Sequence, residues 1–211
     1  MKRVRMWQSV FFLVGFVLWT VSVCFIDVQA IGPGESVVGL AGLNSFVHGM
    51  TGVHMDLYVL TDWLSLIPAV FVMGFGVLGL CQWIHRKRLG EVDRSILALG
   101  VFYIAVMAVY VIFEMLVIND RPVLINGVLE ASYPSSTTVL TVCVMETAEL
   151  QLRVRIQNKR MNNLLTWILR LFTAFMVIAR FLSGVHWFTD IVGGILVSAG
   201  LVYLYRFFAE E

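Results

Sequence analysis

Three short segments of this sequence carry residue types that could perform chemistry, and each segment adjoins a long apolar run. Their candidate residues are Arg121 in Asn-Asp-Arg-Pro, Ser135 and Ser136 after Pro134, and Arg180, His186 and Asp190 at the start of the last apolar run. An ionisable residue at the end of an apolar run is costly unless it is paired or solvated, so each one is a candidate functional residue. Singly, each could equally cap a helix or reach toward water. The combination indicates a shared site.

The residue types suit the handling of a phosphate group. Arg121 and Arg180 offer planar, permanently charged guanidinium groups whose donors match phosphate oxygens. Ser135 and Ser136 follow Pro134 at a predicted helix N-terminus, where free backbone N-H groups and the helix dipole favour an anion. These features predict an anion site.

His186 and Asp190 add a reactive pair to that anion site. They are four residues apart near a predicted helix start and therefore lie on one helix face. The carboxylate can hold one imidazole nitrogen and leave the other free to attack. Together with the arginines, this pair predicts a phosphoryl-transfer site.

A metal site is the main alternative chemistry, and the sequence gives it little support. His48 and His54 lie six residues apart before Asp56, which matches none of the usual zinc spacings. We interpret them as polar residues of an interface. Three cysteines lie in or beside apolar runs and are interpreted as packing residues: Cys24, Cys81 and Cys143.

The elements that must position these residues are apolar helices. Hydrophobic residues make up 59% of the chain, charged residues 14%, and the mean hydropathy is +0.86, which is typical of a membrane protein. The sequence predicts a single all-α domain over residues 1–211, a polytopic bundle with six transmembrane helices. This composition predicts membrane lipids, and no nucleic acid, as partners. The predicted spans are Trp7–Ile26, Leu57–Trp83, Ile96–Ile118, Ser135–Leu150, Leu164–Phe181 and Trp187–Phe207.

The N-terminal region allows two interpretations. Its first apolar run follows a basic start and precedes Val28-Gln29-Ala30, which weakly resembles a signal-peptide cleavage site. Because the run is long for a signal peptide, we expect an uncleaved anchor. The following loop, Asp27–Asp56, has apolar residues at helical spacing, which predicts a short helix lying in the outer interface.

The basic residues predict the orientation of the bundle. Nearly all of them fall on one side of a six-span arrangement: Lys2, Arg3, Arg5, Arg86, Lys87, Arg88, Arg94, Arg153, Arg155, Lys159, Arg160 and Arg206. Lys and Arg concentrate in cytoplasmic loops, so this side and both termini should be cytoplasmic. Arg121 and Arg180 lie on the opposite side, so we expect a site that faces outward from a membrane, a bacterial cytoplasmic membrane in our interpretation.

In these three segments the sequence resembles the type 2 phosphatidic acid phosphatases, which are related to vanadium haloperoxidases. Their third motif reads Ser-Arg, five residues, His, three residues, Asp. Here Arg180-Phe-Leu-Ser-Gly-Val-His186-Trp-Phe-Thr-Asp190 matches it, except that Ala179 replaces the serine. The motifs together cover about Glu114 to Asp190, and the family also has six spans with the site on the outer face.

The first and second motifs are degenerate. The first reads Lys, six residues, Arg-Pro; Arg121-Pro122 fits it, while Glu114 occupies the lysine position. The second reads Pro-Ser-Gly-His and appears here as Pro134-Ser-Ser-Thr137, so that Thr137 replaces the motif histidine.

The resemblance implies a role for each matched residue. His186 would be the nucleophile that forms a phosphohistidine, and Asp190 would orient it. No metal ion and no cofactor are implied. The residues implied to hold the phosphate are Arg121, Arg180, Ser135 and Ser136.

The departures shape the expected activity. Thr137 is a poor general acid because an aliphatic hydroxyl keeps its proton near neutral pH, and loss of a general acid costs on the order of 100 to 10,000-fold in rate. Glu114 would repel phosphate unless it is neutral or turned toward an arginine. A surviving activity would favour a good leaving group, such as that of an isoprenoid pyrophosphate, over the alkoxide of a lipid phosphate.

Three functions follow from these observations. The first is a membrane lipid phosphatase, weakened by Thr137, that acts on a lipid phosphate or isoprenoid pyrophosphate at the extracytoplasmic face. The second is a catalytically inactive protein of the same fold that binds a lipid headgroup. The third is a small transporter or scramblase, which would need polar or broken spans; Gly74, Gly76 and Gly79 are more typical of close helix packing.

Overall fold

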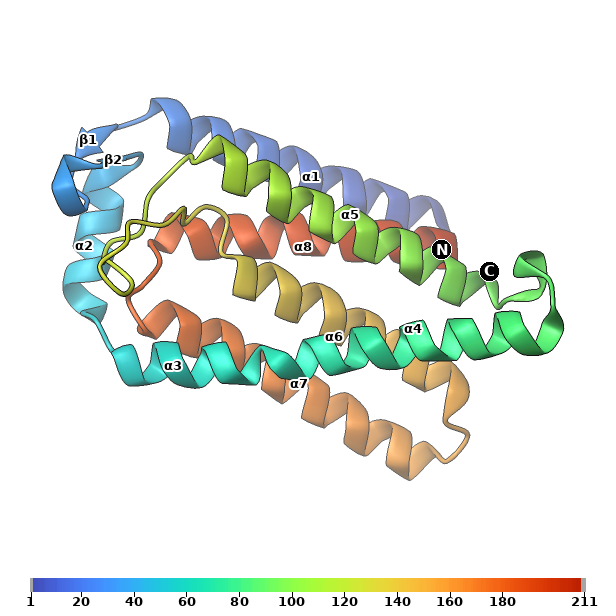
Figure 1. Ribbon diagram of the computed structural model, residues 1–211. Coiled ribbons are helices and arrows are strands. Elements are labelled where there is room, and N and C mark those ends of the chain that lie inside the picture. The colour runs from blue at the N-terminus through green and yellow to red at the C-terminus, as the bar shows by residue number, and fades with distance from the viewer. Residues whose placement is uncertain (1, 210–211) are drawn as a thin grey trace.

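The computed structural model describes residues 2–209 as an elongated bundle of helices (Figure 1). The α-helices are α1 (Lys2–Phe25), α2 (Ala41–Thr51), α3 (Met55–Leu64), α4 (Leu66–Arg86), α5 (Arg94–Leu116), α6 (Ser136–Arg155), α7 (Lys159–Leu182) and α8 (Phe188–Ala209). Two short strands, β1 (Gln29–Ala30) and β2 (Val37–Val38), pair antiparallel. Apart from these two short strands the described chain folds as helices, which confirms the predicted all-α class.

With α3 and α4 taken as one unit, the long helices run along the bundle in alternating directions, and the two ends of the chain lie at the same end (Figure 1). One predicted span, Leu57–Trp83, consists of two helices, α3 and α4, which the sequence pattern did not separate. They meet at Ser65, whose N-H donates to the carbonyl oxygens of Thr61 at 3.0 Å and Asp62 at 3.1 Å. The two helices continue in nearly the same direction (Figure 1).

Among the described residues, five helical segments are long and apolar enough to cross a membrane: Lys2–Phe25, Met55–Arg86, Arg94–Leu116, Lys159–Leu182 and Phe188–Ala209. The fourth predicted span corresponds to α6, which is less hydrophobic than these five segments and is not among them. It packs against α4, α5, α7 and α8, and many of its side chains are buried, including Thr141, Thr147 and Gln151. Because protein surrounds α6, its polar side chains find protein partners. The chain is an integral membrane protein.

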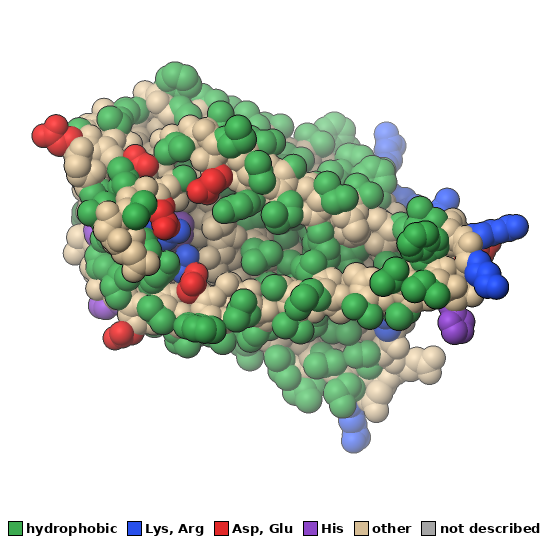
Figure 2. Space-filling view, viewed as in Figure 1, with side chains coloured by type: hydrophobic (Ala, Val, Ile, Leu, Met, Phe, Trp, Pro, Cys, Tyr) green, Lys and Arg blue, Asp and Glu red, His purple; other side chains and the backbone are tan. Residues whose placement is uncertain are grey.

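The surface is apolar along the helices and charged at the two ends. Figure 2 shows hydrophobic side chains along the length of the bundle, with Lys and Arg gathered at the end that holds the termini and acidic side chains at the other end. Exposed apolar side chains of this kind suit a lipid environment.

Two glutamates that weaken the apolar pattern of α6 pair with arginines. Glu149, only 2% exposed, accepts bonds from Arg170 Nε at 2.8 Å and Nη2 at 2.9 Å and from Arg153 at 2.7 Å. Glu146 accepts from Arg206 Nη2 at 3.0 Å. These ion pairs connect α6 to α7 and α8 near the end that carries the termini.

The other end of the bundle is closed by α2 and by the hairpin that β1 and β2 form. The short helix was predicted from the sequence, whereas the hairpin was not. Asn44 of α2 donates to Gly39 O at 2.9 Å and to Thr189 Oγ1 at 3.0 Å, and a ring nitrogen of His48 lies 3.0 Å from Gly184 O. These bonds hold α2 against the turn between α7 and α8.

Candidate active site

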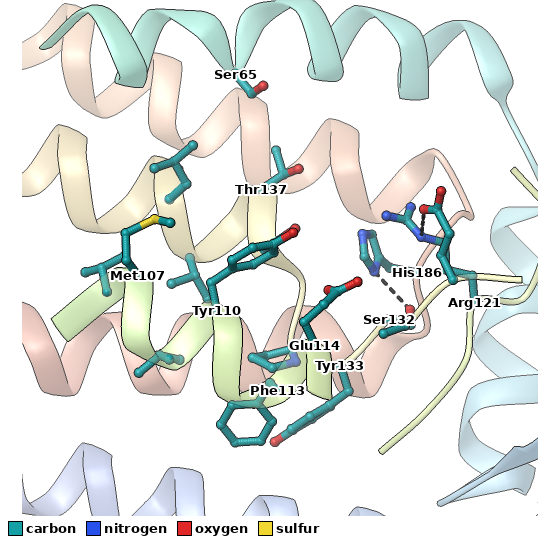
Figure 3. A pocket seen from close by; sticks show the side chains of 18 of the residues that line it. Ser65, Met107, Tyr110, Phe113, Glu114, Arg121, Ser132, Tyr133, Thr137 and His186 are labelled. Carbon is teal, nitrogen blue, oxygen red and sulfur yellow. Dashed lines mark hydrogen bonds and ion pairs between the residues drawn. The ribbon is translucent and has the colours of Figure 1, made fainter. Parts of the chain in front are cut away.

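A cavity of about 470 Å³ lies at this end, bounded by α3, α5, the start of α6, the connection between α5 and α6, and the turn before α8 (Figure 3). Five of the predicted site residues line it: Glu114, Arg121, Ser136, Thr137 and His186. The other three are buried behind its lining: Ser135, Arg180 and Asp190. Residues distant in the sequence thus meet at one place.

His186 is connected to Asp190 through a residue that the sequence did not reveal, Ser132. His186 Nδ1 and Asp190 Oδ2 are 3.7 Å apart, which is too long for the direct hydrogen bond that the spacing predicted. Ser132 Oγ lies 3.0 Å from His186 Nδ1 and donates to Asp190 Oδ2 at 2.5 Å. Both side chains are almost completely buried. A serine therefore links the imidazole to the carboxylate.

This link determines which imidazole nitrogen is free. Asp190 also accepts bonds from the backbone N-H of Trp187 at 2.8 Å and from the side chains of Thr189 at 3.4 Å and Asn119 at 3.5 Å. Because the single hydroxyl proton of Ser132 goes to the carboxylate, Ser132 Oγ can only accept from Nδ1-H. Nε2 then keeps its lone pair.

The surroundings of His186 keep its imidazole neutral. Burial lowers the pKa of His186 well below its ordinary value, and the positive charges of Arg121 and Arg180 lower it further. Nε2 is buried and has no hydrogen-bond partner within residues 2–209. The result is a neutral imidazole with an available nucleophilic nitrogen.

The two arginines share a neighbour on α3. Arg180, 2% exposed, donates from Nη1 to Thr61 Oγ1 at 3.1 Å and lies over the Tyr58 ring, 4.8 Å from its centroid. Arg121 Cζ lies 6.0 Å from the same centroid, and its Nε is 3.1 Å from Glu130 Oε2. Tyr58 and Thr61 were not predicted, because nothing local in α3 distinguishes them from residues of an ordinary apolar helix.

Several guanidinium donors at the site are unused. In the part of the chain that the structure describes, Arg121 Nη1 and Arg180 Nε are buried without a hydrogen-bond partner. A buried, unpaired charged donor is costly, so such groups are typical of a place that binds an anion. With His186 Nε2, they suit a phosphate group.

Of the three residues at the start of α6, two line the cavity and one does not. Ser135 is buried, its N-H donates to Asp190 O at 3.1 Å, and its Oγ accepts from Thr138 at 3.0 Å. Ser136 and Thr137, the first residues of α6, line the cavity. The free backbone N-H groups of the helix start lie beside these two residues.

The remaining walls are acidic near His186 and apolar farther away. Glu114, in the last turns of α5, points toward His186 (Figure 3). Asp62 and Glu130 also line the cavity. Along α5 and α6 the lining becomes apolar, with Val106, Met107, Phe113 and Leu140 among its residues. One cavity therefore joins an ionic end to an apolar groove.

Known proteins resemble this chain in sequence and in fold. The family model of the PAP2 superfamily matches residues 95–210. The crystal structure of the first transmembrane PAP2 type phosphatidylglycerolphosphate phosphatase from Bacillus subtilis superimposes with a TM-score of 0.65, over 95% of this chain and 94% of that chain, at 16% sequence identity. No curated protein matched the sequence. The structural likeness extends over almost the whole bundle.

Proposed function

This chain belongs to the PAP2 superfamily, and on that premise we propose that it is a membrane phosphatase that hydrolyses a lipid phosphate or isoprenoid pyrophosphate through a phosphohistidine at His186. The observation that carries the proposal is His186 Nε2, which has no hydrogen-bond partner among the residues that the structure describes, while Ser132 holds Nδ1. The similar Bacillus subtilis protein is a phosphatidylglycerolphosphate phosphatase, which supports a lipid phosphate as substrate.

In the proposed reaction the phosphate binds between the arginines and His186. Arg121 and Arg180 neutralise its oxygens. Nε2 attacks phosphorus as the bond from phosphorus to the lipid oxygen breaks, so that the lipid leaves and the phosphoryl group stays on His186. The imidazole becomes positively charged, and Asp190 stabilises that charge through Ser132. Water then attacks the phosphohistidine and releases inorganic phosphate.

The proposed topology has six spans, with α6 as the additional one and both termini in the cytoplasm. The basic end seen in Figure 2 supports it, because Lys and Arg concentrate on the cytoplasmic side. The site would then face outward from a bacterial cytoplasmic membrane. The apolar groove between α5 and α6 would receive the lipid chain.

A second candidate function is binding of a lipid headgroup without turnover. The observation that favours it is Thr137, which lines the cavity where the family has a histidine and offers no readily transferred proton. The arginines would still hold a phosphate.

Phosphate release separates the two functions. Purified protein in detergent should release phosphate from at least one of phosphatidylglycerol phosphate, phosphatidic acid and an isoprenoid pyrophosphate. His186→Ala should abolish release while tryptophan fluorescence shows a folded protein. Binding of these lipids without release by the unmodified protein would support the headgroup-binding function instead.

A further inference from the structure

We propose that Glu114 is the general acid of this site, donating a proton to the leaving oxygen of a lipid phosphate. This inference rests on the proposed phosphatase function and names the group that completes it. It assigns a catalytic role to a carboxylate that would otherwise only repel the substrate.

The chemistry requires such a group. An alkoxide is a poor leaving group, and a positioned acid that protonates it contributes about 100 to 10,000-fold in rate. Thr137 and Ser136 have aliphatic hydroxyls, which hold their protons too strongly. Glu130 lies 3.1 Å from Arg121 Nε, so its carboxylate is already engaged in an ion pair. A carboxyl without such a partner is the better donor.

Glu114 has the required position. Its side chain lines the cavity and points toward His186, and it extends from the same helix as the apolar groove residues Met107 and Tyr110 (Figure 3). In phosphoryl transfer the attacking and leaving atoms lie roughly in line on opposite sides of phosphorus. With His186 on one side, the leaving oxygen faces the groove that holds the lipid chain. Glu114 lies between the imidazole and that groove.

Glu114 would face a bound phosphate without a positive partner of its own. No ion pair of Glu114 occurs among residues 2–209. A dianionic phosphate, drawn in by the two arginines, places a like charge beside the carboxylate, and two anions in contact are costly. A proton on Glu114 removes that repulsion and supplies a hydrogen-bond donor. The feature that opposes phosphate binding thereby becomes the proton source.

The Nε2 lone pair of His186 forms the bond to phosphorus, the bond from phosphorus to the lipid oxygen breaks, and that oxygen takes the proton of Glu114. A lipid alcohol leaves, with Glu114 as a carboxylate. In the second half, Glu114 removes a proton from water as the water oxygen bonds to phosphorus. The N-P electron pair returns to His186, and inorganic phosphate departs.

The test compares leaving groups. We would measure kcat/KM of the full-length protein for phosphatidic acid, whose leaving group is an alkoxide, and for p-nitrophenyl phosphate, whose phenolate needs little protonation. Glu114→Gln should lower the rate for phosphatidic acid by at least about 100-fold and for the aryl ester by less than about fivefold. Glu114→Asp should recover part of the lipid phosphatase rate.

Glu35→Gln is the matched control, because Glu35 is an exposed carboxylate between β1 and β2, outside the cavity, and its change should leave both rates unaffected. Equal loss of both activities in Glu114→Gln would overturn the inference, as would a gain in both, which would indicate simple repulsion. If His186→Ala abolishes hydrolysis but Glu114→Gln leaves it unchanged, only the role of Glu114 is refuted. No hydrolysis of any substrate by the unmodified protein sinks the proposed function with it.

Discussion

Replacing Ser132 with alanine should lower kcat/KM while the bundle stays folded, because Ser132 Oγ hydrogen-bonds both His186 and Asp190. Without the hydroxyl, His186 Nδ1 faces Asp190 Oδ2 across 3.7 Å, which is too long for a hydrogen bond. The imidazole then loses both its orientation and the group that conveys the carboxylate charge.

The magnitude follows from the lost contacts. A buried donor left without an acceptor costs about 1–3 kcal/mol. In the proposed transition state the imidazole gains positive charge, so the same loss applies to the activation barrier. Because about 1.36 kcal/mol corresponds to tenfold in rate, kcat/KM should fall roughly 5- to 150-fold. The loss lies at the lower end if His186 and Asp190 move together to make a direct bond.

The assay is phosphate release from the best lipid substrate, with Ser198→Ala as control. Ser198 is also fully buried and donates to a backbone carbonyl, Gly194 O at 2.6 Å, but it lies two turns farther along α8 than Asp190. Its loss should leave kcat/KM unchanged. Full activity in Ser132→Ala, alongside an inactive His186→Ala, would refute the bridging role.

Three further predictions concern other parts of the chain. Thr137→His should raise the rate of phosphate release most for substrates with alkoxide leaving groups, and this gain should be larger in a Glu114→Gln background. An equal gain for every substrate would contradict the prediction. Glu149→Gln should lower the free energy of unfolding by about 1–3 kcal/mol, measured by denaturation in detergent, since it leaves the arginines of α6 and α7 without their shared partner. The matching change Glu146→Gln should cost less, because that carboxylate has one partner and is 29% exposed. A reporter inserted between Arg86 and Glu91 should read as cytoplasmic, and an outside signal would reverse the proposed orientation.

The sequence predicted what is local or repetitive. Apolar runs of sufficient length predicted the helices, because a membrane span needs about 20 apolar residues whatever its tertiary partners. The motif resemblance identified the family correctly. The spacing of His186 and Asp190 predicted one shared helix face, but α8 begins at Phe188 and His186 lies in the turn before it. Each of these patterns is visible within a few turns of chain.

Other features depend on contacts between distant segments. Ser132 lies 54 residues before His186 and has no local pattern that indicates its role. Thr61 meets Arg180 across 119 residues, and Tyr58 reads as an ordinary residue of an apolar helix. The separation of α3 from α4 was also missed, because Ser65 lies within a continuous apolar run. Such features become visible only when the helices are packed.

The polarity of α6 has a consequence for how the protein enters a bilayer. In the proposed six-span topology, an unpaired charged side chain within a span is costly on insertion, and Glu146 and Glu149 lie in the C-terminal half of α6. Glu149 has one partner within α6, Arg153, but Arg170 and the Glu146 partner Arg206 belong to α7 and α8, which emerge from the ribosome later. We therefore expect α6 to wait at the insertion machinery until those helices arrive, so that the last three helices of the chain partition into lipid as one unit.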